Sequence, residues 1–503
     1  MHVWESIKCW AEAAPLKTSI GALSYSELKS AVEQAYLTLP DVKGKKIGLL
    51  AGNTPLWGIY DIALTLKGAT VVPIPTFFSK EQVEHIISDS GIEMAVVDRY
   101  KHYVSTGVGE ALDNTVIILV DCDLEAPGEC KDGPCHIEDL SDREAVTKII
   151  YTSGTTGRPK GVRVTLKGIE AVTKSLIKRT VTKMSDRHLS LLPLSTLVEA
   201  IGGLYVPLSA GSTIIYPKTV FPPENILFRP KGLTEIVRQT APTSLNLVPS
   251  LLEAMLKDVE SMQDLPSTLR FVACGGAPLT AALRERASQL KLPLYEGYGL
   301  SECSSVVALN GAGMSKPGSV GKILFHAALE IAADGEIIVS GPGIMDGYTG
   351  SSEGKKSEIA TGDLGYIDDE GYLFITGRKD NLILTGQGRN VSPEWVESSL
   401  ERSWAIHQVM VYKGKGGDIS ASIVPDKEWI KKVARDYSPG DSLAKILEDP
   451  AAITSMYEEV KAASADLPEY AKLSNIELAE NAFSVENGFL GVDGRLNRKA
   501  ISN

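Results

Sequence analysis

The sequence predicts an α/β protein with a large N-terminal domain of parallel βαβ sheets, a small β-barrel-like part and a smaller α+β domain toward the C-terminal end. Three observations support this prediction. Apolar runs alternate with amphipathic helical segments in the first third of the chain, an order typical of right-handed βαβ units. From about residue 317, short strands alternate with glycine turns, which favours antiparallel or barrel-like structure. A more polar segment follows Glu401.

The strands and helices of the first third can be assigned in chain order. Residues 45–51 ("KKIGLLA"), 69–75 ("ATVVPIP") and 92–98 ("IEMAVVD") are predicted to be buried strands. Residues 55–68 start with a proline and end with a glycine, which indicates a helix between the first two strands. Residues 79–91 have an amphipathic pattern that begins at a serine, a preferred N-cap, so a second helix is expected there.

Further strands are predicted where apolar runs end in glycine-rich loops. The β-branched run "VTKII" (Val146–Ile150) leads into one such loop. Residues 269–276 ("LRFVACGG") and 291–299 ("KLPLYEGYG") lead into two others. The short segments "KPGSVGK", "DGEIIVSGPG" and "DDEGYLFITGR" supply the strands and turns of the barrel-like part.

Composition limits the class of protein. The chain has 503 residues, of which 43% are hydrophobic and 23% charged, as expected of a soluble globular protein with more than one domain. The net charge of −12 argues against a nucleic-acid partner. We expect no membrane span, because no long apolar run is present, and no signal peptide, because residues 1–16 lack a basic start followed by an apolar run. The cysteine usage favours a reducing, cytoplasmic location. Cys130, Cys135 and His136 have a spacing unlike that of paired zinc ligands, so free thiols are expected.

The loop "YTSGTTGRPKGV" (Tyr151–Val162) has the composition of a phosphate-binding loop. Lys160 has the spacing from the first glycine that a Walker loop requires, but Pro159 and Gly161 replace the glycine and the hydroxyl residue that would flank it. Glycines allow the backbone to approach phosphate oxygens closely, and the hydroxyl groups and the lysine can donate to them. The candidate phosphate ligands are Ser153, Gly154, Thr155, Thr156, Gly157 and Lys160.

This loop resembles the phosphate-binding signature of the adenylate-forming superfamily, which includes acyl-CoA synthetases, peptide-synthetase adenylation domains and firefly-type luciferases. The blocks "LSYSELKSAVEQA", "VACGGAPL", "YEGYGLSE", "KPGSVGK", "TGDLGYIDDEGYLFITGRKDN" and "GRNVSPEWVE" match family blocks in the same order. The resemblance covers nearly the whole chain and is strongest to fatty acyl-CoA ligases. It implies an AMP-binding domain over residues 1–379 and a mobile domain over residues 380–503, with a hinge at Asp380.

The resemblance also implies a nucleotide site. Tyr298 would lie against the adenine, Ser301 would bond the α-phosphate, and Glu302 would hold Mg²⁺, a cation that prefers carboxylate and phosphate oxygens. Asp363 would accept hydrogen bonds from both ribose hydroxyls, with Arg378 beside it. The further residues expected to contact the nucleotide are Gly275, Gly276, Ala277, Pro278, Glu296, Gly297 and Gly299. Gly388 would line the tunnel for the pantetheine arm after the domain has rotated.

Two positions depart from the family pattern. Thr196 stands where many acyl-CoA synthetases have a histidine beside the acyl group. Arg495 stands where most members have the lysine that bridges substrate carboxylate and nucleotide, and Lys499 is four residues away from that position. Arginine keeps the charge but differs in shape and donor geometry. Three interpretations follow: Arg495 takes over the role of the lysine, another residue supplies the cation, or adenylation is weak and the protein has a different activity.

The predicted activity is ATP- and Mg²⁺-dependent conversion of a carboxylic acid to acyl-AMP and then to a coenzyme A thioester. Lys160, Ser301, Glu302 and Arg495 are the expected catalytic residues. A largely apolar pocket favours a fatty or aromatic acid, and its candidate lining residues are Thr196, Leu197, Asn246, Leu247 and Leu300. The alternatives are transfer to the pantetheine of an acyl carrier protein, transfer to an amine or to water, and a nucleotide-binding protein that has lost turnover.

Overall fold

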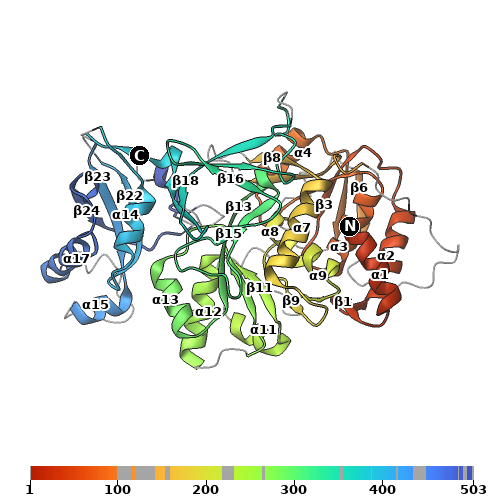
Figure 1. The fold of residues 1–503 in the computed structure, drawn as a ribbon, viewed down its shortest axis with the longest axis horizontal. Helices are drawn as coiled ribbons and strands as arrows, with labels where there is room; N and C mark the ends of the chain where they lie inside the picture. The colour runs from red at the N-terminus through yellow and green to blue at the C-terminus, as the bar shows by residue number, and fades with distance from the viewer. Residues whose placement is uncertain are drawn as a thin grey trace.

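The computed structural model describes residues 2–98, 116–120, 137, 142–152, 159–217, 232–262, 267–351, 355–386, 388–414, 417–433, 449–484, 487–490 and 496–500. Parallel sheets dominate its N-terminal part, as predicted. Figure 1 shows the C-terminal elements in blue at one end of the molecule and the N-terminal helices in red and orange at the other. The zinc-like segment with Cys130, Cys135 and His136 lies outside the described residues.

One N-terminal sheet has the strand order β6-β5-β3-β4-β7-β8. Its neighbouring strands are parallel, except that β7 and β8 pair in antiparallel fashion around the predicted phosphate loop. The strands are β3 (Lys46–Leu50), β4 (Thr70–Pro73), β5 (Met94–Asp98), β6 (Val116–Val120), β7 (Val146–Thr152) and β8 (Lys160–Thr165). The three strands predicted between residues 45 and 98 are confirmed as β3, β4 and β5.

A second, wider sheet has the order β15-β14-β13-β12-β11-β9-β10-β1-β2. Its central strands are parallel and its outermost pairs at both edges are antiparallel. The strands are β1 (Thr18–Ile20), β2 (Leu23–Ser24), β9 (Arg187–Leu189), β10 (Thr213–Ile215), β11 (Ser244–Leu247), β12 (Phe271–Cys274), β13 (Leu294–Leu300), β14 (Ser305–Leu309) and β15 (Lys322–Ile323). The predicted strands in 269–276 and 291–299 are β12 and β13.

The glycine-rich region after residue 317 contains an antiparallel sheet with the order β16-β17-β18-β19, as its pattern predicted. The strands are β16 (Ala328–Ile331), β17 (Glu336–Ser340), β18 (Glu358–Ile367) and β19 (Leu373–Arg378). Beyond it lie the short pair β20 (Ile383–Leu384) and β21 (Asn390–Val391), and a sheet of β22 (Ile406–Lys413), β23 (Ile419–Pro425) and β24 (Asn475–Leu478).

Helices pack around these sheets, and their ends follow ordinary capping rules. Ser79 and Gln82 form a capping box at the start of α4, and Gly91 ends that helix in the left-handed conformation. Pro55 begins α3 as predicted. The helices are α1 (Val3–Ala13), α2 (Tyr25–Thr38), α3 (Pro55–Leu66), α4 (Lys80–Ser90), α7 (Leu166–Thr180), α8 (Leu197–Glu199), α9 (Val206–Ser209), α11 (Leu233–Thr240), α12 (Pro249–Met262), α13 (Ala281–Gln289), α14 (Pro393–Leu400), α15 (Lys427–Val433) and α17 (Pro450–Ala463). None of the described helices is both long and apolar enough to cross a membrane.

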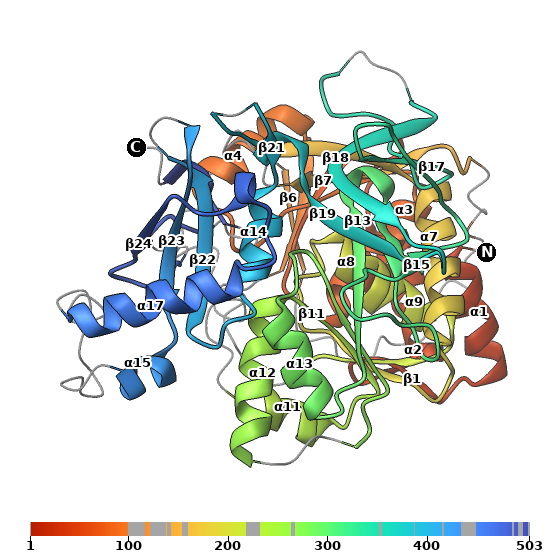
Figure 2. The ribbon, with the colours of Figure 1, turned by 60° about the vertical axis from the view of Figure 1, so that its left-hand side comes forward.

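Several short helical turns matter for the site. A π-helix, η1 (Ala200–Tyr205), continues α8 into α9, and π-helical turns occur often at functional sites. The 3₁₀ turns are η2 (Ser301–Cys303), η3 (Lys379–Asn381), η5 (Glu469–Ala471) and η6 (Arg498–Ala500). Figure 2 shows α11, α12 and α13 side by side, with α14 beside them at the boundary to the C-terminal elements.

The buried hydrophobic residues form separate clusters in different parts of the chain. The largest buried cluster runs from Val3 to Leu373, and a second one lies among β11, β12 and helices α11–α13. A separate cluster extends from Ile383 to Ala471 and unites α14, α15 and α17 with the C-terminal sheet. The chain passes between the first and third clusters through η3.

Candidate active site

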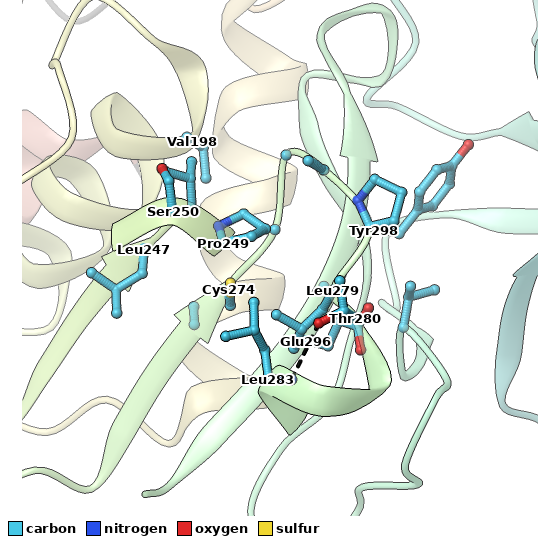
Figure 3. Close-up of a pocket in the computed structure, with 18 of the residues that line it drawn as sticks. Val198, Leu247, Pro249, Ser250, Cys274, Leu279, Thr280, Leu283, Glu296 and Tyr298 are labelled. Carbon is cyan, nitrogen blue, oxygen red and sulfur yellow. Dashed lines mark hydrogen bonds between the residues drawn. The ribbon is translucent and has the colours of Figure 1, made fainter. Parts of the chain in front are cut away.

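The carboxyl ends of β11, β12 and β13 open into one cavity of about 2240 Å³, which also reaches β18, β19 and α14. Adjacent parallel strands bring their carboxyl ends to the same edge, which is where open α/β sheets bind ligands. Leu247 pairs with Cys274, and Cys274 pairs with Glu296, so the loops that follow these strands start side by side. Figure 3 shows Leu247, Cys274, Glu296 and Tyr298 around this pocket.

Most of the residues predicted from the sequence line this cavity. The residues predicted to bind the nucleotide or to act in catalysis that line it are Lys160, Gly275, Gly276, Ala277, Pro278, Glu296, Gly297, Tyr298, Gly299, Ser301, Glu302, Asp363 and Arg378, and the predicted hinge residue Asp380 lines it as well. On the acyl side they are Thr196, Leu197, Asn246, Leu247 and Leu300. Ser153, Gly154, Thr155, Thr156, Gly157 and Arg495 lie outside the described residues. Gly388 is not among the lining residues; it has a positive φ of 74° near the turn that joins β20 to β21.

Tyr298, Asp363 and Arg378 form a connected polar group. The Tyr298 hydroxyl donates to Asp363 Oδ2 at 2.7 Å, and Arg378 Nε lies 2.7 Å from Asp363 Oδ1. Asp363 and Arg378 face each other across the β18–β19 pair, so the sheet register holds the ion pair. Burial, and then the Asp363 charge, raise the pKa of Tyr298, so its hydroxyl stays a donor. A carboxylate has further lone pairs with which to accept ribose hydroxyls.

Glu302 and Lys160 are linked through Tyr348, a residue that the sequence analysis missed. The Tyr348 hydroxyl donates to Glu302 Oε1 at 2.8 Å, and Lys160 Nζ lies 5.8 Å from the centre of the Tyr348 ring. Burial and the Glu302 charge raise the pKa of Tyr348. The backbone explains this proximity, because Tyr348 forms a β-bridge with Val162 on the strand that carries Lys160.

Helix α4 holds both ends of the predicted phosphate loop. The Tyr151 hydroxyl, before the loop, donates to Asp89 Oδ2 at 2.6 Å. His85 Nε2 lies 2.9 Å from the carbonyl oxygen of Pro159, after the loop. Because a carbonyl only accepts, His85 carries its hydrogen on Nε2 in this bond. These contacts join distant parts of the chain, so the local pattern of residues 80–90 could not predict them.

The glycines of the YEGYG segment line the cavity and also have a packing role. A Cβ on Gly299 would overlap the backbone of Ser305, so only glycine allows β14 to approach β13 there. A Cβ on Gly275 would lie 3.0 Å from the carbonyl oxygen of Gly297. The side chain of Glu296 is directed toward Arg284, at 3.5 Å. Burial raises the pKa of Glu296 to about 7 despite that cation.

Polar groups also line the acyl side of the cavity. The sequence analysis noted that Thr196 replaces a family histidine, but a different histidine, His188 on β9, lines the cavity beside Asn246. Asn246 Nδ2 donates to the buried carboxylate of Glu199 at 2.9 Å. The acyl side is therefore less apolar than the lining residues chosen from the sequence suggested.

The C-terminal part contributes an ion-paired arginine at the edge of the cavity. Arg498 Nη2 lies 2.8 Å from Glu397 Oε2 and 3.1 Å from Glu394 Oε1, both on α14. The charges of these carboxylates raise the pKa of Arg498 despite its burial. Arg498 is thus held by α14 in this conformation.

Comparison with known proteins identifies relatives of the whole chain. The profile of the AMP-binding enzyme family matches residues 5–349. The long-chain-fatty-acid–CoA ligase FadD15 of Mycobacterium bovis is 27% identical, with 99% of this chain and 91% of the relative covered. The 2-succinylbenzoate–CoA ligase of Listeria monocytogenes serotype 4b is 28% identical, with 81% and 82% covered.

Solved structures show the same fold. The anthranilate CoA ligase AuaEII in complex with anthranoyl-AMP aligns with a TM-score of 0.80 and 19% identity, covering 100% of this chain and 96% of that chain. The o-succinylbenzoate CoA synthetase of Bacillus subtilis with its acyl-adenylate intermediate aligns with a TM-score of 0.74 and 23% identity, covering 100% and 98%.

Proposed function

Since the chain belongs to the AMP-binding enzyme family, we propose that it is an acid–thiol ligase that converts a carboxylic acid and ATP to acyl-AMP and then to a coenzyme A thioester. The observation that carries this proposal is the single cavity in which Lys160, Glu302 and the Asp363–Arg378 pair face a pocket large enough for an acyl group. The ligase relatives along nearly the full length of the chain support it.

In the first half-reaction, the carboxylate of the acid attacks the α-phosphorus of ATP and pyrophosphate leaves. Two anions must approach each other, so donors and cations around the phosphates lower the barrier. Lys160 supplies a positive charge at the pyrophosphate side, and Ser301 supplies a hydroxyl donor at the α-phosphate. Asp363 accepts the ribose hydroxyls and Tyr298 packs at the adenine, so the α-phosphorus is held in position for attack.

Glu302 is the residue proposed to hold Mg²⁺. Within the described residues, no group of three or more His, Cys, Asp or Glu side chains is arranged to hold a metal ion. A site with one protein carboxylate fits Mg²⁺, which commonly takes the rest of its shell from phosphate oxygens and water. When bound, the ion would supply positive charge to the phosphates. The hydrogen bond from Tyr348 fixes the orientation of Glu302 for this role.

In the second half-reaction, a thiol attacks the acyl carbon and AMP leaves. We propose that the C-terminal domain, residues 380–503, rotates about Asp380 between the two steps and brings Gly388 to the thiol tunnel. Asp380 lies in the three-residue turn η3 between two separate hydrophobic clusters, as a hinge requires. Arg495 is proposed to supply the C-terminal cation of the adenylation step.

Coenzyme A is the proposed acceptor, and the pantetheine of a carrier protein offers the same thiol chemistry. We place the enzyme in the cytoplasm, because Cys9, Cys274 and Cys303 are free thiols in the part of the chain that the structure describes and reduced thiols are typical of that compartment.

Pyrophosphate release from a panel of fatty and aromatic acids, measured with and without coenzyme A, tests the proposal. We expect ATP- and acid-dependent pyrophosphate release and a thioester product only when the thiol is present. Absence of acid-dependent pyrophosphate release across the panel, with ATP bound normally, would show a nucleotide-binding protein instead.

A further inference from the structure

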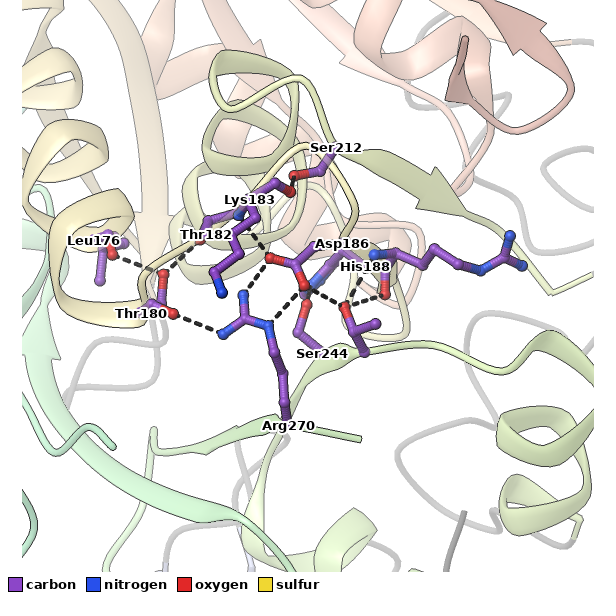
Figure 4. Close-up of polar contacts among 11 residues, drawn as sticks. Leu176, Thr180, Thr182, Lys183, Asp186, His188, Ser212, Ser244 and Arg270 are labelled. Carbon is purple, nitrogen blue, oxygen red and sulfur yellow. Dashed lines mark hydrogen bonds and ion pairs between the residues drawn. The ribbon is translucent and has the colours of Figure 1, made fainter. Parts of the chain in front are cut away.

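A cluster of buried polar side chains lies at the acyl end of the cavity, away from the nucleotide residues. Glu199, at the end of α8, is 0% exposed, and its Oε1 lies 3.6 Å from His188 Nε2. His188 Nδ1 is 3.1 Å from the Ser244 hydroxyl on the neighbouring strand, and Figure 4 shows this pair beside the Asp186–Arg270 contact. Asn246, two residues after Ser244, bonds to Glu199 Oε2 at 2.9 Å.

Three polar atoms of this cluster lack a hydrogen-bond partner within the described residues: Glu199 Oε1, His188 Nε2 and the Tyr216 hydroxyl. Burial, and then the Glu199 charge, raise the pKa of Tyr216, so all three groups are close together. Leaving a buried polar atom unpaired is unfavourable. These buried polar atoms make the surroundings of Asn246 polar, and a polar lining favours an acid with a polar group at this end over an entirely apolar acid.

The backbone of η1 makes room for this cluster. A Cβ on Gly203 would overlap the Glu199 carboxylate and lie 3.0 Å from His188 Nε2. A Cβ on Gly202 would lie 3.0 Å from Asn246 Nδ2. The two adjacent glycines therefore let the π-helix pack directly against the polar groups.

The chemistry of the Glu199–Asn246 contact sets the direction of the Asn246 amide. A carboxylate can only accept hydrogen bonds, so the amino group of Asn246 must face Glu199. The carbonyl oxygen of Asn246 then faces away from Glu199, and Asn246 lines the cavity. The carbonyl oxygen is therefore the polar atom of the Asn246 side chain that Glu199 does not engage, and it can accept a hydrogen bond from a ligand.

Charge around the cluster favours a donor as well. Asp186, the other buried acid nearby, is already paired with Arg270 in two contacts (Figure 4). His188 is the basic side chain that approaches Glu199, and it does so at 3.6 Å, beyond hydrogen-bond distance. Glu199 Oε1 therefore has no described donor within hydrogen-bond distance, and the negative charge of Glu199 favours a hydrogen-bond donor on the ligand nearby.

We propose that the acid activated by this enzyme carries a hydrogen-bond donor, a hydroxyl or amino group, remote from its carboxylate, and that Asn246 Oδ1 receives this donor. Glu199 is a positioning residue that orients Asn246. This inference rests on the proposed ligase function and names its substrate class. Both hydroxy- or amino-substituted aromatic acids and hydroxy fatty acids present this chemistry, so the test includes each.

The test compares matched acids that differ only in the donor. We would measure kcat/KM by pyrophosphate release for benzoate against its hydroxy and amino derivatives, and for medium-chain fatty acids against their terminally hydroxylated forms. Sites that hydrogen-bond a substrate hydroxyl discriminate strongly against analogues that lack it, so the best donor-bearing acid is expected to exceed its parent by roughly 10²-fold or more. If the benzoate pair shows this preference, the substrate is an aromatic acid; if the fatty acid pair shows it, the substrate is an aliphatic acid.

Two variants and a control test whether these residues cause the ratio of kcat/KM between the donor-bearing acid and its parent. Asn246→Leu has a similar volume and no acceptor, so it should reduce the ratio to about 1 while KM for MgATP is unchanged. Glu199→Gln can donate to Asn246 and so allows its amide to turn; it should lower the ratio while KM for MgATP stays as in the wild type. Glu235→Gln, an exposed carboxylate on α11, should leave the ratio as in the wild type. Circular dichroism checks that each variant is folded.

Equilibrium binding of the same acids by calorimetry separates failure of this inference from failure of the ligase function. Selective binding of donor-bearing acids that is lost in Asn246→Leu supports the inference even if no pyrophosphate is released. Turnover of unsubstituted acids with no preference for a donor, or a preference that persists in Asn246→Leu, would overturn the inference and leave the ligase function intact. Absence of both turnover and selective binding would overturn both.

Discussion

Replacing Asp363 with asparagine should weaken ATP binding specifically through the ribose. The carboxylate is 13% exposed and lies 2.7 Å from Arg378 Nε, and it accepts the Tyr298 hydroxyl at 2.7 Å. Asparagine keeps one acceptor oxygen but loses the charge and the second acceptor. A hydrogen bond to a charged group contributes about 1.5–3 kcal/mol. Loss of one such bond to the ribose corresponds to roughly a 10- to 100-fold rise in Kd for ATP.

The fold should tolerate this substitution. Arg378 is 38% exposed, so solvent screens its ion pair with Asp363, and a pair of this kind contributes about 1 kcal/mol or less to stability. We therefore expect a small change in the midpoint of thermal unfolding beside the large change in nucleotide affinity.

A double-mutant cycle with the nucleotide isolates the ribose contact. We would measure Kd by calorimetry for ATP and for dideoxy-ATP, which lacks both ribose hydroxyls, with wild-type protein and Asp363→Asn. The wild type should prefer ATP by roughly 10- to 100-fold, and the variant should nearly lose that preference. Asp334→Asn, which removes an exposed carboxylate paired with Lys379, is the control. Full preference for ATP in Asp363→Asn would refute the placement of the ribose at this residue.

Four further predictions concern the metal, the hinge, the C-terminal cation and a buried histidine. Glu302→Gln should lower the rate of pyrophosphate release and recover partly at high Mg²⁺, because the charge that holds the ion is gone; wild-type kinetics at low Mg²⁺ would place the metal elsewhere. Asp380→Pro restricts φ at the proposed hinge, so separate assays of the two half-reactions should show one retained and the other strongly reduced; equal loss in both argues against rotation there. Arg495→Ala should lower adenylation by about 10²-fold or more and thioester formation from supplied acyl-AMP far less, while Arg495→Lys retains activity; normal adenylation by Arg495→Ala would exclude this role. Burial lowers the pKa of His326 to about 4 from 6.5, so the unfolded chain takes up this proton first as pH falls, and stability should decline by about 3 kcal/mol in total between pH 6.5 and 4. Denaturant unfolding of His326→Asn, which can still bond Ser175, should lack this part of the pH dependence, and an unchanged profile would show that His326 does not titrate as inferred.

Much of the fold could be predicted because its signals are local. Pro55 and Ser79 begin helices at the positions that their backbone preferences and capping chemistry require. The alternation of strand and helix predicted the parallel pairing of β3, β4 and β5. The order of strands in the sheets was not predictable in this way. Strands β1 and β10, for example, are almost 200 residues apart in the chain, and the local sequence pattern of a strand does not specify a partner at that distance.

The residues of the candidate site also differ in whether a local motif or a long-range contact identifies them. Lys160, Glu302 and Asp363 were identified from short contiguous motifs, and they line one cavity. Tyr348 and His85 were missed, because each reaches the site through a contact with a distant segment: Tyr348 through its bridge to Val162, and His85 through the Pro159 carbonyl. Tyr348 lies outside the motifs that were singled out from the sequence.

The sequence alone determined which donors, acceptors and charges the candidate nucleotide site contains, because the predicted phosphate loop and its companion blocks are short segments whose residue types specify them. The tertiary structure decided what surrounds the acyl group. Leu197, Leu247 and Leu300 suggested an apolar pocket, yet β9, β11 and η1 converge there and bring His188, Glu199 and Asn246 together. The hydrogen bonds that a buried carboxylate makes depend on the side chains around it. Strand order and helix packing bring those side chains together, and no local stretch of sequence specifies either.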